Sequence, residues 1–142
     1  MELKATEYDV EDRIATITLN RPHRGNAWTG RMHAEYRYLL GEADADPAVR
    51  VILVTGSGER FCVGGDSQAL DGHSKSGAYD AGTPTDLRKF LTDEAHAIGL
   101  VHRLVAPDQL IAETRAYALD LIARVSPEAL RQTKRQTYLD FH

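Results

Sequence analysis

The sequence predicts an α/β fold with a helical C-terminal third, and three observations lead to this class. Short apolar runs rich in β-branched residues occur at 14–19 and 51–54, as in buried strands. The segment between them carries apolar residues at helical spacing. After Pro107, apolar residues recur only at helical spacing. A chain of 142 residues is long enough for one domain with its own core.

The first half of the chain predicts a hairpin, a helix and a third strand. Residues 8–10 and 14–19 flank a polar turn at 11–13, which indicates a β-hairpin. Thr29 is placed to cap a helix that ends before Pro47. The apolar face of this helix comprises Met32, Tyr36, Leu39, Leu40 and Ala43. Residues 49–55 predict the next strand.

The second half predicts a long loop followed by helices. Residues 71–86 are dominated by Gly, Ser and Asp, and we expect either a flexible loop or a lid over a ligand. A short helix after Thr92 should end at Gly99, and an extended piece should follow at 100–105. A helix opening at Pro107 places these residues on one stripe: Leu110, Thr114, Ala118, Leu121 and Val125. Residues 126–127 (SP) predict the cap of a last helix.

Composition and charge exclude several classes of function. The net charge of −4 argues against a general nucleic-acid or anionic-membrane surface. The single cysteine, Cys62, excludes an internal disulfide and is expected to act as a small apolar side chain. The histidines form no H-x-x-x-H pair and there is no second cysteine, so the sequence does not favour a metal site. The absence of an 18-residue apolar run and of a leader at 1–4 predicts a cytoplasmic protein without membrane spans.

Two loop motifs carry the strongest functional signal. Residues 61–66 (FCVGGD) follow the strand at 51–54, and a glycine pair there brings bare backbone N–H groups beyond the strand end. Such donors suit chemistry that builds negative charge on a carbonyl oxygen, although an ordinary turn has the same pattern. Residues 19–27 (LNRPHRGNA) form the other motif, in which Asn26 is expected to hold the loop shape by bonding nearby backbone.

Together these motifs resemble the crotonase (enoyl-CoA hydratase/isomerase) family. Residues 21–27 are similar to its R-P-x-x-x-N-A element and residues 61–66 to its F-C-x-G-G-D element. Residues 94–101 resemble E-A-x-x-x-G-L-V, and residues 126–134 resemble S-P-x-A-L-x-x-x-K. The resemblance covers 1–70 and 92–140, and the family's central catalytic block and C-terminal end have no counterpart. It implies a crotonase-like ββα-repeat spiral, internally shortened, with a core at 1–91 and a helical segment at 92–142.

The resemblance also implies a chemistry and a set of site residues. The family stabilises a thioester enolate with two backbone N–H groups, and Gly65 matches the first donor. The residues that match substrate and coenzyme A contacts are His23, Arg24, Gly64 and Asp66. The resemblance implies an acyl-CoA substrate, no separate cofactor and a homo-oligomer, either trimer or hexamer. No residue matches the second donor or the family's acid and base, which lie in the central block.

Three functional readings follow from this pattern. The first is an enoyl-CoA hydratase or isomerase that acts through an enolate. The second is a non-catalytic crotonase remnant that binds coenzyme A or an oligomeric partner. The third is another crotonase reaction, such as dienoyl isomerisation, decarboxylation or C–C bond hydrolysis.

Overall fold

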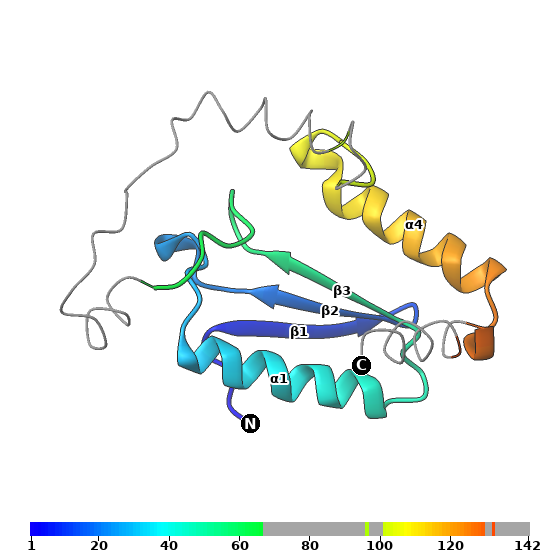
Figure 1. Cartoon of the computed structure of the whole chain (residues 1–142), viewed down its shortest axis with the longest axis horizontal. Coiled ribbons are helices and arrows are strands. Elements are labelled where there is room, and N and C mark those ends of the chain that lie inside the picture. Colours follow the sequence, from blue (N-terminus) through cyan, green and yellow to red (C-terminus); the bar gives the residue numbers. More distant parts are fainter. Residues whose placement is uncertain (67–95, 97–100, 130–131, 133–142) are drawn as a thin grey trace.

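The computed structural model of the chain describes residues 1–66, 96, 101–129 and 132 (Figure 1). Its strands and helices, in chain order, are β1 (Thr6–Glu11), β2 (Ile14–Leu19), the 3-10 helix η1 (Pro22–Arg24), α1 (Gly30–Ala45), β3 (Val51–Gly56), the 3-10 helix η2 (Pro107–Gln109) and α4 (Leu110–Arg124). The loop predicted at 71–86 and the boundary predicted between 91 and 92 lie outside the described residues. The helix predicted to end at Gly99 also lies outside them, except for His96, which is helical.

The three strands form one mixed sheet in the order β1-β2-β3. β1 and β2 are antiparallel, which confirms the predicted hairpin, and β1 begins two residues earlier than the sequence indicated. Asp12 and Arg13 form its turn with φ of 53° and 68°. This pair of left-handed residues suits a hairpin because it matches the twist of the strands. β3 runs parallel to β2, so α1 forms the crossover between them.

The sheet is covered by helices on both faces, and the alternation of side chains along β2 shows why. Leu19 packs with Ala5 and with Met32 of α1. Ile14 points to the other face, where it packs with Leu53 and with Ala118 of α4. Figure 1 shows α1 and α4 on opposite sides of the strands. The two helices therefore bury the two faces of the same short sheet.

α1 follows the sequence prediction at both ends. The Thr29 hydroxyl accepts a hydrogen bond from the Met32 N–H at 3.1 Å, which confirms the predicted N-cap. The helix ends at Ala45, before Pro47, as predicted. Its buried positions include Met32, Leu39 and Ala43 of the predicted stripe, and also one charged residue, Glu35.

Glu35 is fully buried and accepts hydrogen bonds from the start of β1. The Lys4 and Ala5 N–H groups each donate at 2.9 Å, the Thr6 hydroxyl donates at 2.8 Å, and Arg31 adds an ion pair from the preceding turn of α1. Burial by itself raises the pKa of this carboxyl, but the guanidinium, the two N–H groups and the hydroxyl outweigh it and lower the pKa to about 2. Glu35 thus ties the N-terminal segment to α1 as a carboxylate.

The C-terminal part confirms the helix predicted after Pro107, which begins as η2 and continues as α4. Ala118 of the predicted stripe is buried, whereas Leu110 is 49% exposed and does not belong to the buried face. Residues 101–106 form no strand, so the predicted extended piece is irregular. The Ser126 hydroxyl accepts the Ala129 N–H at 3.1 Å, as expected of a cap. None of the described helices is long and apolar enough to cross a lipid bilayer.

Candidate functional site

Two loops meet at the carboxyl ends of β2 and β3, and we call them together the double-loop site. The first loop comprises residues 20–29 and the second residues 57–66. Because β2 and β3 are parallel, both loops leave the sheet at the same edge (Figure 1). In open α/β sheets, this edge is where ligands commonly bind. The fold therefore brings together the two motifs that the sequence singled out.

Asn26 joins the two loops and is fully buried. Its side-chain oxygen accepts the Arg21 N–H at 2.8 Å, and its amide donates to the carbonyl oxygens of Ser57 at 2.9 Å and Arg60 at 2.6 Å. Its φ of 57° is left-handed, a conformation that Asn tolerates better than most residues. These contacts confirm the structural role predicted for Asn26 and extend it to the second loop.

The backbone of the second loop passes close to Gly56, which explains why a glycine stands at the end of β3. A Cβ at Gly56 would lie 2.5 Å from the carbonyl oxygens of both Arg60 and Phe61, and 2.7 Å from the Asn26 amide nitrogen. The loops could not close on each other with a larger residue there. Gly56 is therefore a structural requirement of the double-loop site.

The glycine pair is held in place by the backbone of Trp28. The Trp28 N–H donates to the Gly64 carbonyl oxygen at 2.7 Å, and the Trp28 carbonyl accepts the Asp66 N–H at 2.9 Å. The Gly64 carbonyl and the Gly65 N–H belong to one planar trans peptide, so they point in opposite directions. The bond from Trp28 thereby aims the Gly65 N–H away from the first loop. Among the described residues, this N–H donates to no oxygen.

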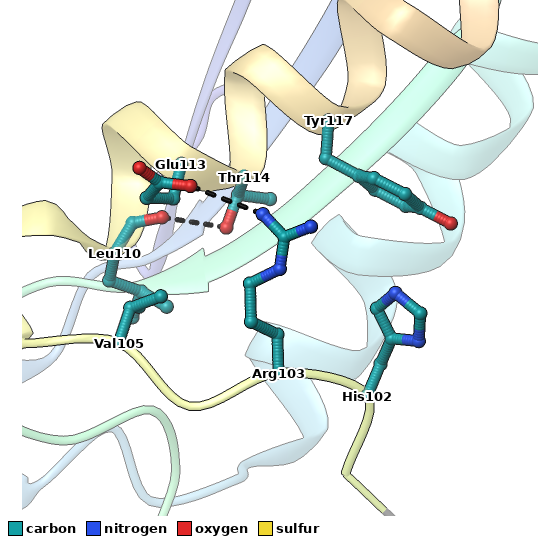
Figure 2. A pocket seen from close by; sticks show the side chains of 7 residues that line it. All are labelled: His102, Arg103, Val105, Leu110, Glu113, Thr114 and Tyr117. Atoms are coloured by element: carbon teal, nitrogen blue, oxygen red, sulfur yellow. Dashed lines mark hydrogen bonds and ion pairs between the residues drawn. The ribbon is translucent and has the colours of Figure 1, made fainter.

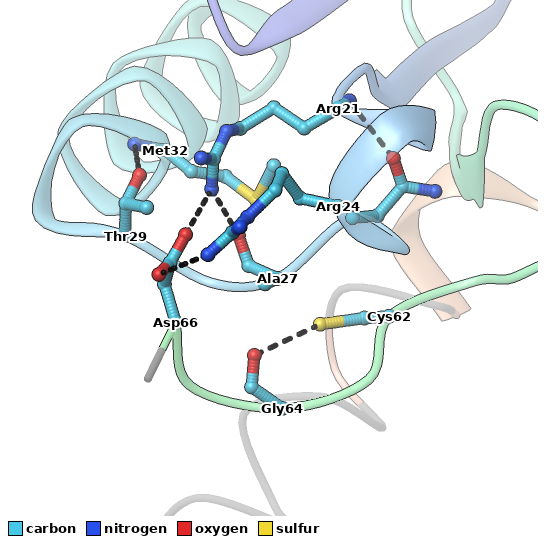
Figure 3. Close-up of polar contacts among 9 residues, drawn as sticks. Arg21, Arg24, Ala27, Thr29, Met32, Cys62, Gly64 and Asp66 are labelled. Carbon is cyan, nitrogen blue, oxygen red and sulfur yellow. Dashed lines mark hydrogen bonds and ion pairs between the residues drawn. The ribbon is translucent and has the colours of Figure 1, made fainter. Parts of the chain in front are cut away.

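Asp66 lies between two guanidinium groups of the first loop (Figure 3). Its carboxylate accepts from Arg21 Nη1 at 3.0 Å and from Arg24 Nη2 at 3.3 Å, and its side chain is only 5% exposed. The same Arg21 nitrogen also donates to the Ala27 carbonyl at 2.8 Å. The sequence singled out Arg24 and Asp66, but it gave no reason to pair them. Arg21, although it starts the R-P-x-x-x-N-A motif, was not among the predicted site residues.

A basic groove lies beside this cluster, between residues 22–25 of the first loop and 58–60 of the second. It has a volume of about 490 Å³, and its lining includes His23, Arg24 and Arg60. Glu59 also lines the groove and is exposed. Arg60 was missed by the sequence analysis; its position directly before the FCVGGD motif was the available signal. The three basic side chains suit a phosphate ligand.

Two further cavities adjoin α4. One, of about 300 Å³, lies between the end of β3 and the first turns of α4, and its lining includes Phe61, Leu110 and Ile111. The other, of about 380 Å³, contains Arg103, which is 3.2 Å from Glu113 and stacks over the ring of Tyr117 (Figure 2). The first of these cavities is lined mostly by apolar residues, together with Glu59 and Arg60. In the part of the chain that the structure describes, no cluster of His, Cys, Asp and Glu could hold a metal ion.

Comparisons with known proteins agree on one family. Residues 14–113 match the family model for enoyl-CoA hydratase/isomerase. The chain is 40% identical over 81 residues to a protein of Mycobacterium tuberculosis H37Rv named "Probable enoyl-CoA hydratase EchA14", a match that covers 57% of this chain and 30% of the relative. It is 42% identical over 57 residues to the 1,2-epoxyphenylacetyl-CoA isomerase of Escherichia coli K12, covering 40% of this chain and 22% of the relative.

Solved structures show the same fold. An enoyl-CoA hydratase from Mycobacterium tuberculosis H37Rv superposes with a TM-score of 0.78 at 20% identity, covering 96% of this chain and 90% of that one. The enoyl-CoA hydratase EchA12_1 from Mycobacterium marinum gives a TM-score of 0.73 at 26% identity, covering 94% and 96%. The predicted crotonase-like α/β fold is thus confirmed. The matched segment spans less than a third of either curated relative's length. The chain belongs to the enoyl-CoA hydratase/isomerase family, the crotonases.

Proposed function

We propose that the chain binds an acyl-CoA thioester at the double-loop site and promotes hydration or double-bond migration as an enoyl-CoA hydratase or isomerase. In this proposal the Gly65 N–H donates to the thioester carbonyl oxygen, with Gly64 keeping the approach clear of side chains. His23 and Arg24 bind phosphates of the coenzyme A portion. Coenzyme A enters as part of the substrate, so no separate cofactor is involved.

The observation that carries the proposal is the direction of the Gly65 N–H. The 2.7 Å bond from the Trp28 N–H to the Gly64 carbonyl fixes the shared peptide plane. A donor that is oriented before the substrate arrives needs no reorganisation when charge develops on the oxygen. Such a donor typically lowers the barrier by about 3 kcal/mol. Gly64 supports the approach because a Cβ at that position would meet no atom of the described residues within 4 Å.

The basic groove supports recognition of the coenzyme A portion. Arg24 and His23 both line it, and Arg60 from the second loop adds a third basic side chain. Phosphate oxygens accept well from guanidinium groups, which can bind them through two parallel hydrogen bonds. The groove adjoins the cluster that holds Asp66, so phosphate and carbonyl recognition would occur within one pair of loops.

The proposed reaction uses this donor at the carbonyl oxygen. For hydration, the water oxygen bonds to the β-carbon of the enoyl group, and the double-bond electrons move toward the thioester oxygen to form an enolate. One water proton is lost to a base, and a proton is then added at the α-carbon, so that one water is added overall. The Gly65 N–H stabilises the enolate oxygen in this scheme. We assign no residue as acid or base.

Matched substitutions at Gly65 test the proposal. Gly65 is not among the glycines with positive φ, so alanine fits its backbone and keeps the N–H, while proline removes it. We expect Gly65→Ala to bind crotonyl-CoA as the unmodified chain does and Gly65→Pro to bind it about 10-fold more weakly. Calorimetric titration measures binding, and loss of enoyl absorbance measures hydration. Equal affinity of the two variants for crotonyl-CoA would contradict the assignment of Gly65.

A control separates loss of the N–H from unfolding. The only cysteine, Cys62, lies three residues before Gly65, so chemical ligation at Cys62 can install an ester in place of the Gly65 amide. The ester removes the N–H without adding a ring, and thermal unfolding checks that the fold is retained. Binding without hydration by the unmodified chain would support the reading of a non-catalytic remnant.

Family membership also leads us to expect a homo-oligomer, a trimer or hexamer. Light scattering should then give a mass three or six times the 15.7 kDa of the chain. A stable monomer at micromolar concentration would contradict this expectation.

A further inference from the structure

We propose that Asp66 is a positioning residue that couples phosphate binding at Arg24 to the orientation of the Gly65 amide. This inference rests on the proposed function of the double-loop site. Asp66 directly follows Gly65 in sequence, and its carboxylate contacts Arg24 of the basic groove. The residue therefore lies between the group that would bind phosphate and the group that would bind the thioester oxygen.

The backbone of Asp66 forms one half of this connection. Its N–H donates to the Trp28 carbonyl at 2.9 Å, and the Trp28 N–H donates to the Gly64 carbonyl at 2.7 Å. These two bonds flank the Gly65 residue on either side. A shift of Asp66 along its bond to Trp28 would move the rigid Gly65–Asp66 peptide, which meets the Gly64–Gly65 peptide at the Cα of Gly65. The aim of the Gly65 N–H is thus sensitive to where Asp66 lies.

The carboxylate of Asp66 forms the other half, and its two arginines are not equivalent. Arg21 binds at 3.0 Å, is 21% exposed and is also held by the Ala27 carbonyl. Arg24 binds at 3.3 Å, is 36% exposed and lines the basic groove. A phosphate in the groove would compete with the carboxylate for Arg24, while Arg21 would keep its contact. Asp66 would then be drawn toward Arg21, and the Gly65 peptide would move with it.

The experiment follows the backbone amide resonances and the Arg24 side-chain Nε–H resonance while adenosine 3′,5′-bisphosphate is added to the ¹⁵N-labelled full chain. This probe carries phosphates but no acyl group, so it cannot reach Gly65 through a thioester. We expect the Arg24 Nε resonance and the Gly65 amide resonance to shift together with the same apparent Kd. In Asp66→Asn, the Arg24 shift should persist and the Gly65 shift should fall to less than half. Asp9→Asn, which removes an exposed carboxylate on β1, should leave both shifts unchanged.

A second variant keeps the test decisive if Asp66→Asn does not fold. Arg24→Gln leaves the contact between Arg21 and Asp66 intact, and saturating probe should then leave Gly65 unshifted. A Gly65 shift that persists in Asp66→Asn or in Arg24→Gln would overturn the coupling, because proximity alone would explain it. An Arg24 shift without any Gly65 shift in the unmodified chain would also overturn it while leaving phosphate binding intact. No shift at either residue would overturn phosphate binding itself, and the coupling with it.

Discussion

Replacing Glu35 by glutamine should remove much of the acid sensitivity of the fold. The Glu35 carboxylate is fully buried and accepts from Lys4, Ala5, Thr6 and Arg31. A glutamine of the same shape has one oxygen and one NH₂ group. The NH₂ group would face donors that need an acceptor, so at least one buried donor would lose its partner.

The size of the effect follows from the pKa of Glu35, which is lowered from 4.5 to about 2. One pKa unit corresponds to about 1.4 kcal/mol, so the ionised carboxyl stabilises the folded chain by about 3 kcal/mol at neutral pH. Because the pKa is lower in the folded state, this stabilisation is complete above pH 4.5 and is lost as the pH falls toward 2. This loss is a large share of the free energy of unfolding of a typical domain, which is roughly 5–15 kcal/mol.

Urea unfolding followed by the fluorescence of Trp28, the only tryptophan, measures these changes. Trp28 packs against the cluster that contains Met32 of α1, so its emission reports on this region. At pH 7 we expect Glu35→Gln to lose about 3 kcal/mol, and the two proteins should converge near pH 2. Glu42→Gln, at an exposed position of the same helix, should change stability by less than about 0.5 kcal/mol. If Glu35→Gln kept the full pH dependence of the unmodified chain, this account of Glu35 would be wrong.

Three further predictions concern packing and surface charge. Gly56→Ala should cost more than about 2 kcal/mol in urea unfolding, because its Cβ would meet two carbonyl oxygens at 2.5 Å. Gly41→Ala, at an exposed position of α1 where a Cβ would meet no described atom within 4 Å, should gain about 0.5–1 kcal/mol. Equal effects of the two substitutions would contradict the close approach at Gly56. Asn26→Ala should lower the free energy of unfolding by about 2–4 kcal/mol, because it removes three hydrogen bonds and places alanine at a left-handed φ. A melting temperature unchanged within roughly 2 °C would contradict this expectation. Arg115→Gln breaks a 2.7 Å ion pair with Glu11 and should lower the free energy of unfolding by less than about 1 kcal/mol. In roughly 1 M salt we expect no measurable loss, because the charges are screened. A loss that does not depend on salt would show that the ion pair is not its cause.

The regular elements could be predicted from the sequence because they depend on short-range patterns. The polar turn at 11–13, the cap at Thr29 and the stripe through Met32, Leu39 and Ala43 each act within a few residues. The same holds for the helix after Pro107. Strand ends were less well predicted, by up to two residues, because pairing with a neighbour rather than local preference decides where a strand begins.

The contacts of the candidate site could be predicted only in part. The motifs gave the residues of both loops, but the pairing of Asp66 with Arg21 and Arg24 spans more than 40 positions and has no local pattern. Glu35 was missed although a signal existed, since it stands three residues after Met32 and four before Leu39 on the apolar stripe. A charged residue at such a position calls for buried partners, which the sequence could not name.

The amide resonance of Gly65 reports directly on whether its N–H binds the thioester oxygen. A ¹⁵N-labelled chain of 15.7 kDa is small enough for each glycine amide to be followed during titration with crotonyl-CoA and, separately, with free coenzyme A. We expect the Gly65 proton to move downfield with crotonyl-CoA well beyond any change with free coenzyme A, because the N–H gains a carbonyl acceptor. Equal changes with the two ligands, or a Gly65 signal that stays still while His23 and Arg24 respond, would contradict it.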